Sequence, residues 1–273
     1  MRVLVLGASG MLGHKVHQVC RQQFDTWAGG RRLLGLDATH WSTVEDGITL
    51  AKPDAIVNCI GVVPQTLPKL ETMVAVNAVF PLRLAMLCRE RGIRLIHIST
   101  DCVFSGLRGN YSEADLPDAE DVYGMTKFAG EPPPPCLTLR TSLIGPQLVG
   151  RYSLLEWFIA QRGSCVPGYT NVWFSGFTTL AFARIVADIL ASEEWLSGLY
   201  HVSSPTITKY KLLCLVNAMY DLNITVEAAC ATQSDRSLDS NRFRDATGFQ
   251  PPSWRKMIEE MQTDTANGGS SDT

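Results

Sequence analysis

The chain has 273 residues, enough to bury the core of one large α/β domain or of a domain with an added lobe. Its 24 basic and 27 acidic residues give a net charge of -3, which excludes a general electrostatic attraction to nucleic acid or to an anionic membrane. The sequence runs from Met1 into apolar residues without a charged leader, and we find no stretch of about 18 apolar residues. We therefore expect a cytoplasmic protein with no nucleic-acid or membrane partner.

The N-terminal stretch predicts a nucleotide site. An apolar run from Arg2 to Leu6 is typical of a parallel strand that is covered on both faces, and a glycine-rich turn and a helical pattern follow it. Glycines in such a turn let the backbone approach a pyrophosphate, whose charge then lies at the N-terminal end of the helix. The residues expected to bind a dinucleotide are Gly7, Ser9, Gly10, Met11, Leu12 and Gly13.

The region after the second predicted strand, Asp25 to Ala28, bears on the choice of cofactor. An acidic residue at this point would bind the ribose hydroxyls of NAD, whereas arginine accommodates the 2'-phosphate of NADP. Arg31 and Arg32 stand there, and guanidinium groups bind phosphate through paired hydrogen bonds, so we expect NADP(H). The alternative is that both arginines are solvated loop residues. Asp37 is a further candidate, as a contact to the adenine amine.

Two buried runs come next and are counted as the fourth and fifth strands. The first begins at Ala55, and Cys59, Ile60 and Gly61 at its carboxyl end are expected to line the cofactor. The following helix ends at Gly92. Asn77 interrupts the apolar face of this helix, and we expect its side chain to be buried and hydrogen-bonded. The second run, Arg94 to Ile98, brings a group of polar side chains to the same edge of the sheet: Ser99, Thr100 and Asp101.

A tyrosine and a lysine lie four residues apart in the predicted helix after this strand. Tyr123 and Lys127 therefore project from one face of that helix. A free phenol titrates near pH 10, but a neighbouring ammonium favours the phenolate and lowers that value. We expect Tyr123 to be a proton donor that Lys127 tunes, with Thr100 supplying a hydroxyl.

The remaining segments suggest a second lobe. After a surface loop from Phe104 to Val122 and a run of prolines, Leu137 to Thr141 predicts a sixth strand. Trp173 and Phe174 could form the floor of a pocket or belong to the core. Thr208 is expected to cap a helix, and the basic run from Arg236 to Arg244 could reach a diphosphate or form a solvated face. Amphipathic helices are expected at 154–162 and 180–190, and a strand at 199–202.

These elements predict an α/β fold, a doubly wound parallel sheet of the Rossmann type with a smaller C-terminal α/β lobe. We expect an NADP-binding domain over residues 1–145, with parts of 170–205 packing back on it. Residues 146–262 would form mainly the substrate-binding lobe, and 263–273 a disordered tail. The eight cysteines show no CxxC pair and the histidines no ligand spacing, so we expect reduced, mostly buried thiols and no metal.

Three motifs together resemble the extended short-chain dehydrogenase/reductases, and most closely the dTDP-4-dehydrorhamnose reductase group. They are Gly7 to Gly13, Ser99 to Gly106 and Tyr123 to Glu131. The resemblance implies a C-terminal lobe for a nucleotide sugar, and Thr100, Tyr123 and Lys127 in the family's Ser/Thr-Tyr-Lys roles. Ser99, Tyr123 and Lys127 would also contact the cofactor, and hydride would pass from NADPH to a 4-keto carbon of the sugar. Expected substrate contacts are Thr100, Asp101, Cys102, Val103, Phe104, Trp173 and Phe174.

Cys102 departs from the pattern of that group. The reductases usually show tyrosine at this position and the sugar 4,6-dehydratases glutamate, so the chain lacks the carboxylate that dehydration needs. Two alternatives remain open beside the reductase. One is an NAD-dependent nucleotide-sugar epimerase, and the other is a non-catalytic NADP-binding subunit resembling the methionine adenosyltransferase β subunit. The helices that flank Tyr123 could also pair in a homodimer.

Overall fold

The computed structural model describes residues 1–230 and 233–268 of the chain. Strands and helices alternate in its first half, in the order β1 (Arg2–Leu6), α1 (Gly13–Cys20), β2 (Asp25–Gly29), α2 (Trp41–Ala51), β3 (Ala55–Asn58), η1 (Pro64–Thr66), α3 (Leu70–Val74), the π-helix η2 (Ala75–Val79), α4 (Phe80–Arg91), β4 (Arg94–Thr100), η3 (Asp101–Val103), α5 (Val122–Ala129) and β5 (Leu137–Thr141). The second half contains β6 (Leu143–Ile144), α6 (Leu154–Ile159), β7 (Cys165–Tyr169), β8 (Val172–Phe174), β9 (Phe177–Thr178), α7 (Thr179–Ala191), β10 (Gly198–His201), β11 (Ile207–Thr208), α8 (Lys209–Tyr220), β12 (Thr225–Ala229), β13 (Ser234–Asp235), α9 (Asn241–Thr247) and α10 (Trp254–Gly268).

A parallel sheet in the order β10-β5-β4-β3-β1-β2 forms the centre of the molecule. It has the doubly wound Rossmann-like arrangement, so the predicted fold class is confirmed. The strand count was wrong, because it required a strand between β2 and β3. Residues 30–40 instead form turns, with Gly30 bridging to Leu33, before α2 begins. The strand β2 is therefore an edge of the sheet.

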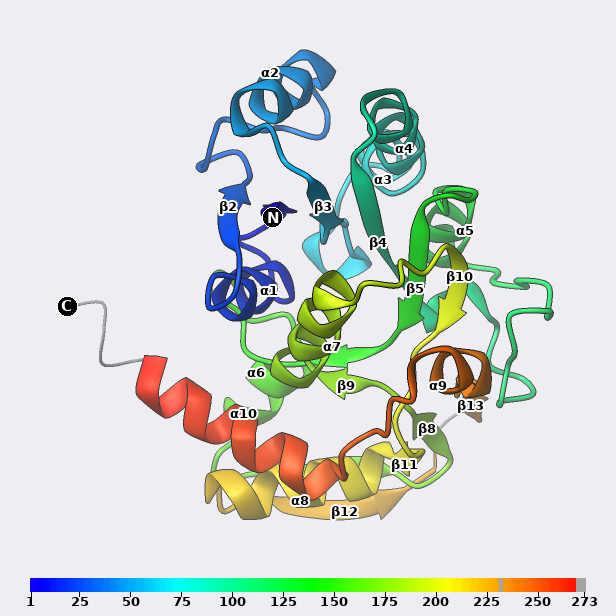
Figure 1. Cartoon of the computed structure of the whole chain (residues 1–273). Coiled ribbons are helices and arrows are strands. Elements are labelled where there is room, and N and C mark those ends of the chain that lie inside the picture. Colours follow the sequence, from blue (N-terminus) through cyan, green and yellow to red (C-terminus); the bar gives the residue numbers. More distant parts are fainter. Residues whose placement is uncertain (231–232, 269–273) are drawn as a thin grey trace.

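Helices cover both faces of this sheet (Figure 1). In β1, Val3 and Val5 belong to the core that α1 and α7 cover, whereas Leu4 and Leu6 belong to the core under α2 and α4. Successive side chains of a strand point to opposite faces, so a strand that is buried on both faces must be apolar throughout. This is why β1 has no polar residue between Val3 and Leu6.

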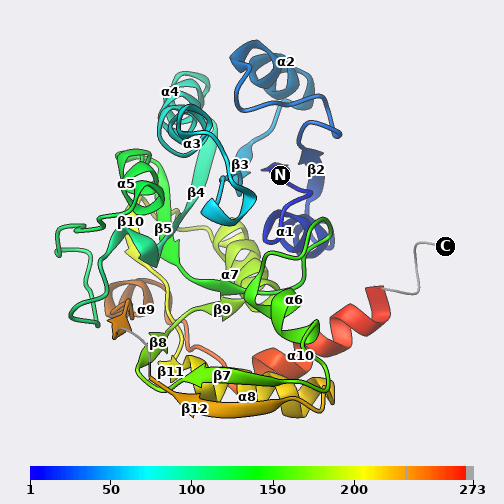
Figure 2. The same cartoon turned by 180° about the vertical axis from the view of Figure 1, so that it is seen from behind.

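The C-terminal half adds small sheets to one end of the central sheet. They have the strand orders β11-β8-β13, β12-β7 and β6-β9, and Figure 2 shows β7, β8, β12 and α8 grouped together at that end. Thr208 caps α8 as predicted, because its side chain accepts a hydrogen bond from the Lys211 N–H. Not all of this half lies in the lobe, since β10 pairs in parallel with β5 and α7 packs against α1.

The helical stretch Leu70–Arg91 is the part of the described chain that passes a test for membrane spans, by length and composition alone. The expectation that no such stretch exists was therefore wrong. Half of its most apolar part is buried (50%), and the core helix of a soluble protein passes the same test. Asn77 in this stretch is 1% exposed, and its amide both accepts from the Val62 N–H and donates to the Val62 carbonyl at 2.8 Å. The prediction of a hydrogen-bonded buried asparagine is confirmed.

The prediction of a disordered tail is wrong for residues 263–268. Residues 263–268 belong to α10, whereas the predicted tail at 269–273 lies outside the described residues. Asp264 forms an ion pair with Lys15 of α1, and Met257 and Met261 of the same helix are buried. A polar sequence extends the helix here because one face of α10 packs on the molecule.

All eight cysteines are free thiols. Cys20, Cys88 and Cys136 are buried but Cys165 and Cys230 are exposed, so the prediction of mostly buried thiols holds only in part. Within residues 1–230 and 233–268, no group of three or more His, Cys, Asp or Glu side chains could hold a metal ion.

Candidate active site

The glycine-rich turn joins β1 to α1 at the carboxyl edge of the sheet. Gly7 has a φ of +77°, and a Cβ there would lie 3.1 Å from the backbone of Cys59. A Cβ on Gly13 would lie only 2.1 Å from the Gly7 carbonyl oxygen, so α1 can approach β1 only at a glycine. In the described part of the chain, the backbone N–H groups of Ser9, Met11 and Leu12 donate to no other group. These free donors and the close backbone packing fit a bound pyrophosphate.

The residues after β3 lie beside this turn. The Cys59 N–H donates to the Leu6 carbonyl at 3.0 Å, and the Ile60 N–H donates to the Asn58 side chain at 3.1 Å. Gly61 is exposed. The three residues predicted to line the cofactor, Cys59, Ile60 and Gly61, are thus at the same edge as the glycine turn.

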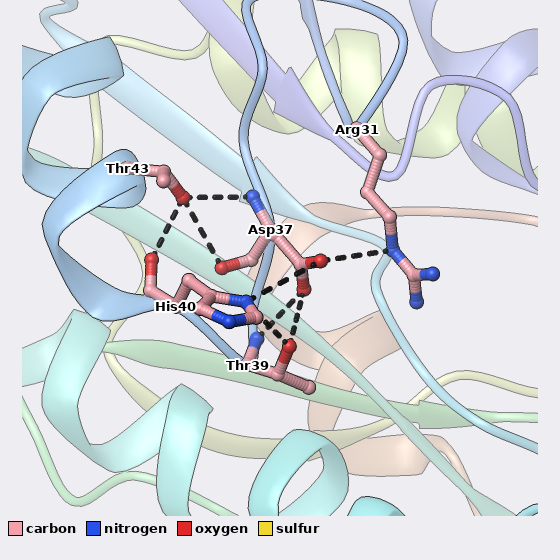
Figure 3. A network of polar contacts seen from close by, with 5 residues as sticks. All are labelled: Arg31, Asp37, Thr39, His40 and Thr43. Carbon is pink, nitrogen blue, oxygen red and sulfur yellow. Dashed lines mark hydrogen bonds and ion pairs between the residues drawn. The ribbon is translucent and has the colours of Figure 1, made fainter.

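The two arginines lie just past β2. Arg31 and Arg32 are both exposed, and the Arg31 Nε lies 3.4 Å from an Asp37 carboxylate oxygen. Figure 3 shows Asp37 within a local network, where the Thr39 N–H donates to its carboxylate at 2.9 Å and its own N–H donates to the Thr43 hydroxyl. Partial burial opposes ionisation of Asp37, but its hydrogen bonds with Thr39 and the nearby Arg31 hold its pKa below the usual value. Asp37 thus organises this loop, and its charge lies beside Arg31.

The end of β4 carries the next group of polar side chains. Thr100 is 8% exposed, and its hydroxyl accepts from the Cys102 N–H at 3.1 Å and donates to the Asp101 carboxylate at 3.2 Å. Burial raises the pKa of Asp101, and the positive charges of Arg236 and Lys209 oppose that rise. Burial also raises the pKa of the Cys102 thiol to about 12. Cys102 is therefore a neutral thiol beside Thr100 at physiological pH.

The helix α5 brings Tyr123 to this edge. Asp121 caps the helix by accepting from the Gly124 N–H at 2.9 Å, which places Tyr123 and Lys127 one turn apart as predicted. Burial raises the pKa of Tyr123, and the nearby Cys102 adds to the rise, while the nearby Thr100 hydroxyl opposes it. The predicted meeting of Tyr123 and Thr100 is therefore seen in the structure.

The predicted effect of Lys127 on Tyr123 is wrong for this structure. Lys127 is 4% exposed, and its ammonium donates to the Ile98 carbonyl at 2.8 Å. It is not among the groups that shift the pKa of Tyr123, which is raised and not lowered. Burial lowers the pKa of Lys127 itself to about 8, and the Glu131 charge opposes this shift. The tyrosine is thus a neutral phenol, and the lysine titrates near physiological pH.

The predicted substrate contacts separate into two groups. Val103 and Phe104 are fully buried in a small core with Tyr111, whose ring stacks on that of Phe104 at 4.1 Å. Their buried side chains hold the loop in place. Phe174 is also buried, but Trp173 is 39% exposed and lines a cavity of about 490 Å³. The aromatic pair therefore contributes one residue to a pocket and one to the core.

Two positively charged side chains lie beside this site, and sequence reasoning did not single out the second, Lys209. Arg236 donates to the Phe104 carbonyl at 2.8 Å and contacts the Cys102 sulfur at 3.9 Å, so it lies beside the segment that follows β4. Lys209 lies 4.2 Å from the Phe174 ring centroid and acts on Asp101. No local pattern marked Lys209, which is only the first residue of an ordinary helix. The basic run 236–244 does not act as a unit, because Arg242 stacks on Tyr200 and Arg244 reaches Ser203.

The fold and these residues define an extended short-chain dehydrogenase/reductase, with a glycine turn after β1 and a threonine, a tyrosine and a lysine at the ends of β4 and α5. Residues 1–142, more than half of the chain, match the family model described as RmlD substrate binding domain. The chain belongs to this family.

Individual relatives include sugar reductases. The chain is 29% identical over 229 residues to the probable low-salt glycan biosynthesis reductase Agl14 of Haloferax volcanii, with 75% of each chain covered. It is 37% identical over 134 residues to a dTDP-4-dehydrorhamnose reductase of Streptomyces griseus, covering 48% of this chain and 43% of that protein. The latter alignment therefore spans less than half of the relative.

A subunit of another enzyme also resembles the chain. The β subunit of methionine adenosyltransferase 2 from Danio rerio is 27% identical over 244 residues, covering 81% of this chain and 74% of that protein. Among solved structures, the dTDP-4-dehydrorhamnose reductase of Bacillus anthracis in complex with NADP has a TM-score of 0.84 at 21% identity, covering 97% and 99% of the two chains. This likeness confirms the fold over nearly the whole chain.

Proposed function

We propose that the protein is an NADPH-dependent reductase of a 4-keto nucleotide-activated deoxysugar. The observation that supports it most is the closeness of Thr100 and Tyr123 at the carboxyl edge of the sheet, with Lys127 buried one helical turn further along α5. The glycine turn with its free N–H donors fits the pyrophosphate of a dinucleotide. When bound, NADPH supplies the hydride for the carbonyl carbon.

The chain's own residues act on the carbonyl oxygen. Negative charge gathers on that oxygen as the carbon accepts hydride, so a proton and a hydrogen bond at this atom stabilise the transition state. Tyr123 is the proposed proton donor, and it suits this role because its pKa is raised and the phenol is neutral. Thr100 would donate a hydrogen bond to the same oxygen. Lys127 would hold the nicotinamide ribose, and its ammonium would stabilise the negative charge that forms on the Tyr123 oxygen when the proton leaves.

Arg31 and Arg32 are proposed to bind the 2'-phosphate of NADPH. Replacing both with alanine removes charge-assisted hydrogen bonds, each of about 1.5–3 kcal/mol, so the Kd for NADPH should rise by at least about 100-fold. The Kd for NADH should change far less, since NADH has no phosphate there. Fluorescence titration with both cofactors measures this, and Arg255→Ala on the exposed side of α10 serves as a control. An equal loss for both cofactors would remove the phosphate assignment.

The titration of Lys127 predicts the pH dependence of the reaction. Its pKa is lowered to about 8 by burial, so the charged form is lost as the pH rises through that value. We expect kcat/KM to be level below this pH and to fall above it, because kcat/KM follows the free enzyme. A Lys127→Arg variant that retains activity should lack this fall, since arginine stays charged. A level profile to about pH 9 in the unmodified enzyme would contradict the role of Lys127.

A non-catalytic regulatory subunit is the second candidate. It is favoured by the alignment with the methionine adenosyltransferase β subunit, which covers 81% of this chain. The presence of Thr100, Tyr123 and Lys127 together favours the enzyme instead. An epimerase is supported less well, because Arg31 and Arg32 favour NADP over a tightly held NAD. An NADPH oxidation assay over a panel of 4-keto dTDP-, UDP- and GDP-sugars separates these functions. Oxidation with one sugar supports the reductase, and none with any sugar would refute it.

A further inference from the structure

A buried ion pair lies directly behind the candidate active site. Glu131 follows α5, four residues after Lys127, and its carboxylate accepts hydrogen bonds from two side chains. The Ser99 hydroxyl donates at 2.6 Å, and Arg140 donates twice, from Nε at 2.8 Å and from Nη2 at 2.7 Å. The side chains of Arg140 and Glu131 are only 2% and 9% exposed. This bidentate arrangement fixes the position of the carboxylate.

Arg140 of this ion pair also contacts a histidine, and that histidine contacts Tyr111 in the loop after Phe104. Arg140 Nη1 lies 3.2 Å from His201 Nε2, and His201 Nδ1 lies 2.9 Å from the Tyr111 carbonyl oxygen. A guanidinium can only donate and a carbonyl can only accept, so His201 is neutral and carries its proton on Nδ1. Burial also lowers the pKa of His201 to about 4, which agrees with this state. The two contacts of His201 therefore define its tautomer and its charge.

Lys127 lies next to this network. Its ammonium donates to the carbonyl of Ile98, the residue that precedes Ser99 on β4. The groups that act on Lys127 from the surrounding elements are the Glu131 carboxylate and, more weakly, the Cys59 thiol. His97 on β4 is buried near Lys127, and this positive neighbour helps to keep its imidazole neutral. In the described part of the chain, Glu131 is thus the carboxylate that favours the charged form of Lys127.

Stability alone does not explain a buried ion pair at this place. Desolvation of the two charges offsets much of their attraction, and well-packed apolar residues are often as stabilising. We infer that Glu131, held by Ser99 and Arg140, is a positioning residue that keeps Lys127 in its ammonium form and fixes the end of α5 against β4. This inference rests on the proposed function, because Glu131 is given a role only through its effect on Lys127.

Titration of Lys127 tests the inference without any substrate. The protein is labelled with [ε-13C]lysine, and the Lys127 resonance is assigned by its loss in Lys127→Arg. A midpoint at about 8 is expected in the unmodified protein, because burial lowers the pKa of Lys127. It should fall by about one pH unit in Glu131→Gln, and it should stay near the original value in Glu131→Asp, which keeps the charge. Glu259→Gln on the exposed part of α10 is the control, with no change expected.

A second variant covers the case in which Glu131→Gln fails to fold. That variant leaves Arg140 buried without its partner, whereas the double variant Glu131→Gln/Arg140→Met removes both charges. Arg140 is not among the groups that act on Lys127, so the double variant should show the same fall. An unchanged Lys127 midpoint in either folded variant overturns the inference. If the unmodified protein reduces none of the sugars, the proposed function fails, while the lysine titration still decides the role of Glu131.

Discussion

Tyr123→Phe is expected to reduce the rate of NADPH-dependent carbonyl reduction by about 10²- to 10⁴-fold, the usual contribution of a positioned proton donor. The variant loses a single hydroxyl, so the Kd for NADPH should change by no more than about twofold. The hydroxyl meets Thr100 at the carboxyl edge of the sheet, and its raised pKa leaves it protonated before the reaction. Steady-state NADPH oxidation and a fluorescence titration with NADPH measure the two quantities.

A second tyrosine provides the control for this variant. Tyr169 on β7 is 38% exposed and belongs to the two-stranded sheet β12-β7, away from the central sheet. Tyr169→Phe should leave both the rate and the NADPH affinity unchanged. Full activity of Tyr123→Phe would show that another group protonates the carbonyl oxygen. A loss of rate with an equal loss of NADPH binding would show instead that the tyrosine holds the cofactor.

Gly13→Ala is expected to destabilise the protein and to weaken NADPH binding. The new methyl carbon would lie 2.1 Å from the Gly7 carbonyl oxygen and 2.6 Å from the Gly7 carbonyl carbon, well inside contact distance. Either the α1 helix or the turn must move, and overpacking of this kind costs about 1–3 kcal/mol of unfolding free energy. The displaced turn would also misplace the N–H donors of Ser9, Met11 and Leu12. Urea unfolding and NADPH titration measure the two effects.

Gly30→Ala is the matched control, because it adds the same methyl group at the same edge of the sheet. The nearest atom to that methyl group would be the Ser9 hydroxyl oxygen at 4.0 Å. Its unfolding free energy should therefore change by less than about 1 kcal/mol. If Gly13→Ala is as stable as Gly30→Ala, the close approach of α1 to β1 does not depend on a glycine.

The sequence predicted the sheet well where the signal was local. The apolar runs of β1 and β3 and the spacing of Tyr123 and Lys127 all correspond to elements of the structure. The absence of a strand between β2 and β3 was not predicted. The strands had been numbered by the usual order of this fold, although residues 30–40 themselves carry no strand pattern. The extension of α10 through Asp264 depends on an ion pair with Lys15, a partner 249 residues away.

The electrostatics of the site were the least predictable part. The spacing of Tyr123 and Lys127 indicated a shared face, but the pKa of the phenol depends on burial and on Cys102, neither of which is visible in that spacing. Glu131 carried a usable signal, since it stands four residues after Lys127, just past the end of α5. Its partner Arg140 carried no such signal, because an arginine in a buried strand gives no indication of which carboxylate it contacts.

The most direct measurement of the central claim follows the hydride itself. The protein is incubated with NADPH that carries deuterium at C4 of the nicotinamide, together with each 4-keto nucleotide sugar, and the sugar products are examined by mass spectrometry and NMR. A reductase should place deuterium on the former carbonyl carbon and consume an equal amount of NADPH. Sugar turnover without NADPH consumption would indicate an epimerase, and NADPH binding without any sugar turnover would indicate a regulatory subunit. Either of these two results would contradict the proposed function.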